Sequence, residues 1–187
     1  LLQGSRTELE VAEMSYKSRI DEMKFGYKQN VETPIFKDIF QYQNENNINI
    51  FSSLVLGGIL TEQTDFLALA DAQTNIIANN GVQRKGVKYN PHRLISSAIA
   101  SGKQIISSES ISYDELVRED SRVVRLLTQN TKIDPNSNPN FLARYIITPV
   151  KAENRKILGA LVSREIAKPA LVERVNEILK HGYSAIY

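Results

Sequence analysis

The hydrophobic pattern of the chain changes character near residue 64, and the part before it is helical. From Thr7 to Val31, apolar residues recur at spacings of three and four, at Leu9, Ala12, Tyr16, Ile20, Met23, Tyr27 and Val31. This spacing places them on one face of a helix, with charged residues of both signs between them. The seven-residue rhythm fits a short coiled coil. The alternative is a helix that lies on the sheet of its own domain.

Two further helical segments are predicted before residue 64. Thr33-Pro34 interrupts the first pattern, because proline lacks an amide hydrogen and disfavours helical geometry at the preceding residue. A second helix begins there, with Ile35, Phe36, Ile39 and Phe40 facing inward, and a third helical piece runs from Ile50 to about Leu60. We therefore expect residues 1–63 to form an N-terminal helical segment.

Residues 64–167 instead carry short apolar runs between polar connections, which is typical of strands. The candidates are Phe66–Asp71, Asn75–Gly81, Lys103–Ser108, Ala143–Lys151 and Lys156–Ser163. The first two and the last two are joined by short connections and predict antiparallel hairpins. The first connection lacks the Asn-Gly or Asp-Gly pair of the commonest two-residue loops, so its turn type stays open.

Helices are predicted between the second and third strands and between the third and fourth. Asn90 can cap the first of them, and Gly102 is placed to end it, while the second covers Tyr113 to Leu127. The pattern predicts an α+β fold, in which long N-terminal helices pack on one five-stranded antiparallel sheet. Residues 168–187 are expected to form a C-terminal helix over Lys168–Lys180 and the start of a further element.

Composition narrows the possible chemistry. The 187 residues contain no cysteine and two histidines, and their formal net charge is +2. The lack of cysteine excludes disulfides, thiolate zinc sites and cysteine nucleophiles, and two histidines argue against a histidine-rich metal site. The balanced charge argues against a nucleic-acid partner. We expect neither a cofactor nor a metal.

Motifs for catalysis are also missing from the sequence. Gly57-Gly58 is not followed by the Lys-Ser/Thr of a phosphate loop, and Ser107-Ser108-Glu109-Ser110 lacks the glycines of a nucleophile elbow. Asp71 and Asp134 do not suggest paired catalytic carboxylates. These observations predict that the chain is not itself an enzyme.

The longest apolar run is too short for a membrane span. Ile48 to Leu60 is about a dozen residues with several polar interruptions, whereas a spanning helix needs roughly 20 apolar residues. The sequence has no initiator methionine and no recognisable signal peptide, and it opens within a helical pattern. We interpret it as a fragment of a longer protein.

Three motifs resemble one family. They are Ala70-Asp71-Ala72-Gln73-Thr74-Asn75-Ile76, the helix end Ala98-Ile99-Ala100-Ser101-Gly102-Lys103, and Pro149-Val150 followed by Gly159 to Ile166. In this order they resemble a Cache domain, the PAS-like extracytoplasmic sensor module of bacterial membrane receptors. The resemblance covers about residues 60–167. The chain departs from it at Thr74, where family members often have glycine, and it lacks the Arg/His cluster of citrate-type sensors and the Tyr/Trp-and-Asp set of amino-acid receptors.

The resemblance implies a ligand site between the sheet and the loop and helix that follow the second strand. Carried over by position, its residues are Arg84, Lys88, Tyr89, His92, Ser107, Ser108, Arg144, Tyr145 and Thr148. Since strand neighbours alternate, Arg144 shares a face with Thr148, opposite to Tyr145. We interpret Arg144 and Ser107 as a pair able to hold an anionic group. The alternatives are a solvent-facing Arg144, an exposed His92 and a solvated loop at residues 84–88.

The function implied by the resemblance is ligand sensing. We expect an extracytoplasmic, periplasmic domain of a membrane-tethered receptor, resembling the input modules of histidine kinases, nucleotide cyclases or chemoreceptors. It would bind a small molecule, form a homodimer through its N-terminal helix and relay a helix displacement across the membrane. The alternative is a cytoplasmic PAS- or GAF-like dimerisation and regulatory module.

Overall fold

The computed structural model describes residues 2–42, 46, 49–51, 64–80, 84–119 and 139–167. Its elements are α1 (Leu2–Val31), α2 (Pro34–Tyr42), β1 (Phe66–Asp71), β2 (Ile76–Asn79), η1 (Pro91–Arg93), α4 (Leu94–Ser101), β3 (Ile105–Ser112), α5 (Tyr113–Glu119), β4 (Asn140–Lys151) and β5 (Ile157–Ile166). The expected C-terminal helix, the element after it and most of the third helical piece lie outside the described residues.

The five strands form one sheet in the order β2-β1-β5-β4-β3. Each neighbouring pair is antiparallel, which confirms the predicted α+β fold. Strand β3 runs on to Ser112 and β5 to Ile166, beyond the predicted ends at Ser108 and Ser163. The end of β3 was missed because this edge strand is partly polar, although its burial alternates along most of its length. The end of β5 was missed because it carries the charged residues Arg164 and Glu165.

The turn between β1 and β2 explains why threonine occupies a glycine-like position. Thr74 has a left-handed backbone with φ of 68°. The Asp71 carboxylate accepts hydrogen bonds from the amides of Gln73 at 2.9 Å and Asn75 at 2.8 Å. An aspartate that bonds the backbone ahead of it stabilises this kind of turn. Asp71 is therefore part of the turn.

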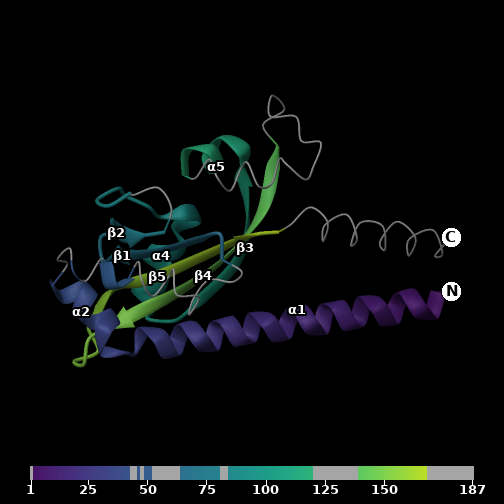
Figure 1. The fold of residues 1–187 in the computed structure, drawn as a ribbon, viewed down its shortest axis with the longest axis horizontal. Helices are drawn as coiled ribbons and strands as arrows, with labels where there is room; N and C mark the ends of the chain where they lie inside the picture. The colour runs from purple at the N-terminus through teal and green to yellow at the C-terminus, as the bar shows by residue number, and fades with distance from the viewer. Residues whose placement is uncertain are drawn as a thin grey trace.

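Helices cover both faces of the sheet (Figure 1). The face that we call the α4 face packs against α4, α5 and the segment after β2, and its core contains Phe66, Tyr89, Ile95, Tyr145 and Val162, among others. The opposite face, the α1 face, packs against α1 and α2. Its core residues include Tyr27, Phe36, Phe40, Leu69, Ile146 and Leu161. The sheet is thus the middle layer of three.

Helix α1 lies along its own sheet, as one of the two interpretations of its pattern expected. Tyr27 and Val31 are buried on the α1 face, and the N-terminal end of the helix projects beyond the sheet (Figure 1). The Tyr27 hydroxyl is 2.9 Å from the Thr64 hydroxyl, and the Gln104 side chain donates to the Lys24 carbonyl at 3.1 Å. None of the described helices is long and apolar enough to cross a membrane.

Candidate functional site

A group of buried polar side chains interrupts the apolar core of the α4 face. We call it the Arg164 cluster, and its members are Arg84, Tyr89, Glu119, Tyr145 and Arg164. Arg164 is fully buried in β5. It lies in register with Phe66 of β1 on one side and Tyr145 of β4 on the other. A buried arginine requires compensation, since removing its charge from water is costly.

The backbone after β2 positions Arg84 and Tyr89 over this row. The Gly86 amide donates to the Ile76 carbonyl at 2.7 Å, and the Tyr89 amide donates to the Thr74 carbonyl at 2.8 Å. The Arg84 amide donates to the Asn79 side chain at 2.9 Å. These bonds hold the segment beside β2, so that Tyr89 points into the core instead of into solvent.

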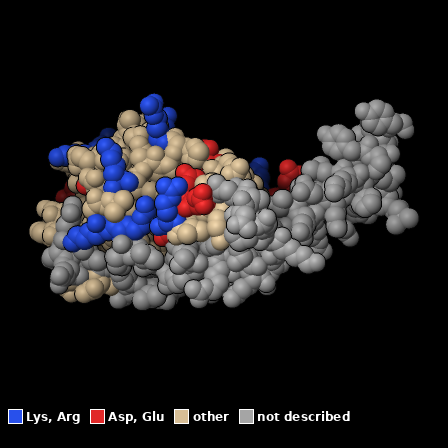
Figure 2. Space-filling view, turned by 90° about the horizontal axis from the view of Figure 1, so that it is seen from above, with Lys and Arg blue, Asp and Glu red and all other residues tan. Residues whose placement is uncertain are grey.

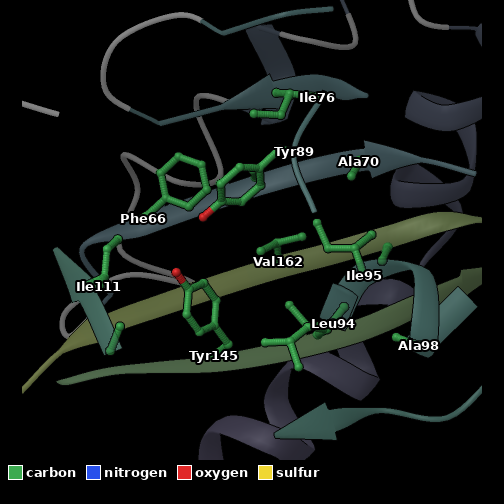
Figure 3. Close-up of a cluster of buried hydrophobic side chains, with 14 of the residues drawn as sticks. Phe66, Ala70, Ile76, Tyr89, Leu94, Ile95, Ala98, Ile111, Tyr145 and Val162 are labelled. Carbon is green, nitrogen blue, oxygen red and sulfur yellow. The ribbon is translucent and has the colours of Figure 1, made fainter. Parts of the chain in front are cut away.

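Rings and guanidinium groups alternate in the cluster. The Phe66 and Tyr89 rings meet edge to face, with centroids 5.3 Å apart. The guanidinium carbon of Arg164 lies 5.1 Å from the Phe66 centroid, and that of Arg84 lies 5.3 Å from the Tyr89 centroid. Such cation–π contacts are worth more when they are removed from water. Figure 3 shows Phe66, Tyr89 and Tyr145 converging, with the two tyrosine hydroxyls pointing toward one another.

Glu119, at the end of α5, supplies the carboxylate that both arginines share. Arg164 donates through its Nη1 to Glu119, and the Nη1 of Arg84 lies 3.7 Å from the Glu119 Oε1. Burial lowers the pKa of Arg164, while Tyr89 and Asp65 act in the opposite direction. Arginine nevertheless keeps its charge in proteins, so the cluster holds two cations around one shared carboxylate.

Several donors in the cluster have no hydrogen-bond partner within the described part of the chain. They are the Nε and Nη2 of Arg164, the Nη1 of Arg84 and the hydroxyl of Tyr89, all inaccessible to solvent. Burial raises the pKa of the Tyr89 phenol, so it keeps its proton at neutral pH. Burial likewise raises the pKa of Tyr145. Buried donors without acceptors are rare in folded proteins, and they call for an explanation.

The structure brings together three of the nine predicted site residues, Arg84, Tyr89 and Tyr145, in this cluster. Two more, His92 and Ser107, meet at Glu109 on the same face: the His92 Nδ1 is 3.6 Å from the Glu109 carboxylate, and the Ser107 hydroxyl donates to it. The exposed-histidine alternative also holds, because the His92 side chain is 47% exposed. Lys88 is exposed.

The predicted pairing of Arg144 with Ser107 is wrong. Ser107 pairs with Tyr145, whereas Arg144 pairs with Ser108, and strand neighbours point to opposite faces. Arg144 and Thr148 lie on the α1 face instead. The guanidinium carbon of Arg144 is 4.0 Å from the Tyr16 ring centroid of α1, so Arg144 is not solvent-facing either. Burial lowers its pKa, and the nearby Glu165 opposes this.

The two residues at the centre of the cluster, Arg164 and Glu119, were not predicted from the sequence. Arg164 had a detectable signal: it falls in the alternation Ala160, Val162, Arg164, Ile166, on the buried side of a strand. Glu119 had none, because it lies 45 positions from Arg164 and only the packing of α5 joins them.

Among the described residues, no group of three or more His, Cys, Asp or Glu side chains is placed to hold a metal ion. The candidate site is therefore described by its arginines, tyrosines and shared carboxylate. An arrangement of this kind can bind and orient an anionic or hydrogen-bonding group.

No family model matches the sequence, and no curated protein matches it. Solved structures with a similar fold are sensor domains. The sensor domain of the histidine kinase DctB from Vibrio cholerae superposes with a TM-score of 0.55 at 16% identity, over 88% of this chain and 55% of that one. A domain of a putative sensory box/GGDEF family protein from Vibrio parahaemolyticus gives 0.53 at 11% identity, over 88% and 61%.

These similarities establish the fold, which this chain shares with these two domains. The chain spans less than two thirds of the length of either structure. At such low identity the similarity carries no site residues across, so the function has to be argued from the residues of this chain.

Proposed function

We propose that this chain is the ligand-sensing input region of a signal-transduction receptor, with its ligand site on the α4 face. The proposal rests on Arg164, which is fully buried. Its Nε and Nη2 have no hydrogen-bond partner among the described residues, and neither has the nearby Tyr89 hydroxyl. A core that served packing alone would gain from an apolar residue at this position. The similarity to sensor domains supports the same interpretation.

Strand β5 gives the site a direct connection to α1. Arg164 faces the cluster, and the next residue, Glu165, faces the α1 side. There Glu165 accepts a hydrogen bond from Arg19 of α1, and its other carboxylate oxygen lies 3.6 Å from the Nη1 of Arg144. A ligand that favours one position of β5 therefore favours one position of α1. The response is limited by the difference in ligand affinity between the two states.

The proposal includes a location: the domain lies outside the cytoplasm and is tethered to the membrane by segments of the longer protein. It is supported by the fold shared with the DctB sensor domain and by the long helix α1, whose N-terminal end leaves the sheet. A topology reporter fused after residue 187 of the full-length protein tests it. Activity of a periplasm-dependent reporter is expected, and activity of a cytoplasm-dependent reporter alone contradicts it.

A dimerisation and regulatory role is the second candidate, because α1 exposes apolar side chains on the side away from the sheet. Val11, Met14 and Phe25 are exposed to 60%, 72% and 64%. Their spacing of three and eleven residues keeps them close to one stripe of the helix. Sedimentation at several concentrations tests dimer formation through α1, with Phe25→Glu as the variant expected to weaken it and Lys17→Glu as the control.

The ligand-sensing proposal is tested by a thermal-shift screen of the full chain against amino acids, organic acids, purines and polyamines. A ligand that binds only the folded state raises the melting temperature, because it stabilises that state by an amount that grows with the logarithm of the ligand concentration once this exceeds Kd. We expect at least one class to stabilise the protein, with the effect lost in Arg164→Gln. If no class does so for a folded protein, the sensing proposal fails.

A further inference from the structure

We propose that the Arg164 cluster binds the carboxylate of a small amphipathic acid, held by the Nε and Nη2 of Arg164 and by the hydroxyl of Tyr89. This inference rests on the proposed sensing function, and it names the chemical class of the ligand. It also identifies Arg164, which sequence analysis did not select, as the principal binding residue.

The edge of the Arg164 guanidinium group that carries Nε and Nη2 has a geometry that suits a carboxylate. An arginine presents five N–H donors in a fixed planar fork. In Arg164 the Nη1 is used by Glu119, while the Nε and the Nη2 are buried without a hydrogen-bond partner among the described residues. The Nε and Nη2 hydrogens lie along one edge of the group and point in parallel. Two parallel donors match the two oxygens of a carboxylate better than any single acceptor.

Tyr89 supplies a third donor. Its buried hydroxyl makes no hydrogen bond of ordinary geometry in the described part of the chain. Tyr145 and Arg164 lie within looser hydrogen-bonding reach of it, and both lower its pKa against the larger effect of burial. Since burial raises that pKa, the phenol keeps its proton at neutral pH and can donate it. A phenol that donates to a carboxylate makes a charge-assisted hydrogen bond, which is stronger than a neutral one.

The charges around this edge favour an anion over a cation. Arg84 and Arg164 share Glu119, and Asp65 also contributes to the field at Arg164. Glu109 lies farther along β3, where it is engaged by Ser107 and His92. An ammonium group at this edge would meet two guanidinium groups, whereas a carboxylate completes the hydrogen bonding of Arg164.

The residues around the Arg164 cluster indicate that the part of the ligand beyond the carboxylate is apolar. Phe66, Ile111 and Val162 belong to the same core cluster as Tyr89 and Tyr145, and they lie around the two hydroxyls in Figure 3. An apolar body next to the carboxylate would therefore pack against apolar walls. Basic residues follow β2 in the sequence: Lys85, Lys88 and Arg93 are exposed, and Figure 2 shows Lys and Arg side chains in several patches on one face of the described surface. Such charges speed the approach of an anion.

The experiment compares acids with their uncharged analogues. Binding of acetate, butyrate and benzoate to the full chain is measured by calorimetry and by amide chemical shifts at constant ionic strength, against acetamide, butyramide and benzamide. We expect the acids to bind and the amides to bind at least about tenfold more weakly, because an amide replaces one acceptor oxygen with a donor and removes the charge. We expect butyrate and benzoate to bind more tightly than acetate.

Three variants assign the binding to named atoms. Tyr89→Phe removes one hydroxyl from a buried ring, and we expect it to weaken acid binding about tenfold while the protein stays folded. Arg164→Lys removes the parallel edge and is expected to abolish the preference for acids over amides. Arg144→Lys is the matched control, since Arg144 is a similarly buried arginine on the opposite face and its replacement should leave acid binding unchanged.

The outcomes separate this inference from the proposed function. If the acids and amides bind equally, or if Tyr89→Phe leaves acid binding unchanged, the carboxylate assignment is overturned. If another ligand class stabilises the protein through the same face while the acids do not bind, the sensing function stands and only the ligand class is wrong. If Arg144→Lys weakens acid binding as much as Arg164→Lys, the acid binds on the α1 face and the assignment fails.

Discussion

The two faces of the sheet each bury one arginine, and the two arginines are held in different ways. Arg144, on the α1 face, is covered by the long helix α1, which stacks Tyr16 on its guanidinium group. Its Nη1 is also buried without a hydrogen bond, but it faces a Glu165 oxygen 3.6 Å away. Arg164, on the α4 face, is covered by short segments from three parts of the chain. It has one carboxylate, and its Nε and Nη2 lack partners among the described residues.

This difference separates a structural arginine from a candidate binding arginine. Arg144 belongs to a chain of contacts, Tyr16, Arg144, Glu165 and Arg19, which attaches α1 to the sheet. Arg164 has an edge that nothing in the described fold uses. Buried charge by itself therefore does not indicate a binding site, and the partners of each nitrogen have to be examined.

The largest effect is expected at Gly159, where the α1 face is packed most tightly. A Cβ at this position would lie 2.1 Å from the Ala70 carbonyl oxygen and 2.4 Å from the Phe40 ring. Gly159→Ala must separate β5 from β1 or displace α2, and we expect a loss of about 4 kcal/mol in the free energy of unfolding. Denaturant unfolding measures it. Gly26→Ala in α1 is the control, because its Cβ meets nothing within 4 Å and it should stabilise by about 0.5–1 kcal/mol.

Removing the carboxylate beside each buried arginine tests whether the folded protein depends more on Glu119 at the α4 face than on Glu165 at the α1 face. Glu119→Gln leaves Arg164 charged and buried without an anion at its Nη1, and we expect it to cost about 3 kcal/mol. Glu165→Gln on the α1 face should cost about 1 kcal/mol, since Arg19 is partly exposed and Arg144 keeps its contact with the Tyr16 ring. Equal losses in denaturant unfolding would contradict the comparison.

The attachment of α1 should depend on the ring of Tyr16. Tyr16→Leu keeps an apolar side chain but removes the cation–π contact with Arg144, which is worth about 0.5–1 kcal/mol at a partly exposed site. Hydrogen exchange of the α1 amides should become faster while that of β5 changes little. Tyr16→Phe keeps the ring and should restore slow exchange. Unchanged exchange in Tyr16→Leu would show that the contact does not hold the helix.

The smallest effect is an alkaline loss of stability that is specific to the α4 face. Burial raises the pKa of Tyr89 and Tyr145 above the usual value of about 10. The folded state therefore holds these protons more tightly, so stability is complete below that pH and falls as the pH rises above it. Arg164, whose pKa is lowered, acts in the opposite direction. Tyr89→Phe should reduce the loss that denaturant unfolding measures between about pH 9 and about pH 11, the range around the usual tyrosine value. An identical loss in the variant would contradict this origin.

Much of the architecture could be predicted from local patterns. The period of three to four in α1, the short apolar runs of the strands and the polar connections between them predicted the antiparallel sheet and the helix lying on it. These patterns are local, because a helix or strand that buries one face repeats its apolar residues with a fixed period. The same alternation predicted that Arg144 and Tyr145 lie on opposite faces, which their contacts with Tyr16 and with the α4-face core confirm.

The candidate site depended on contacts between distant segments. Arg84, Glu119 and Arg164 come from a loop, the end of a short helix and a strand, and no spacing in the sequence relates them. Ser107 was paired with the wrong arginine because the register of β3 against β4 decides which residues are neighbours, and register is set by the packing of both strands. The sequence by itself determined which segments are helix and strand. Only the tertiary structure decided that the unbonded nitrogen of Arg144 faces a carboxylate while Arg164 keeps two nitrogens without a partner among the described residues, since that depends on donors and acceptors that meet after the chain has folded.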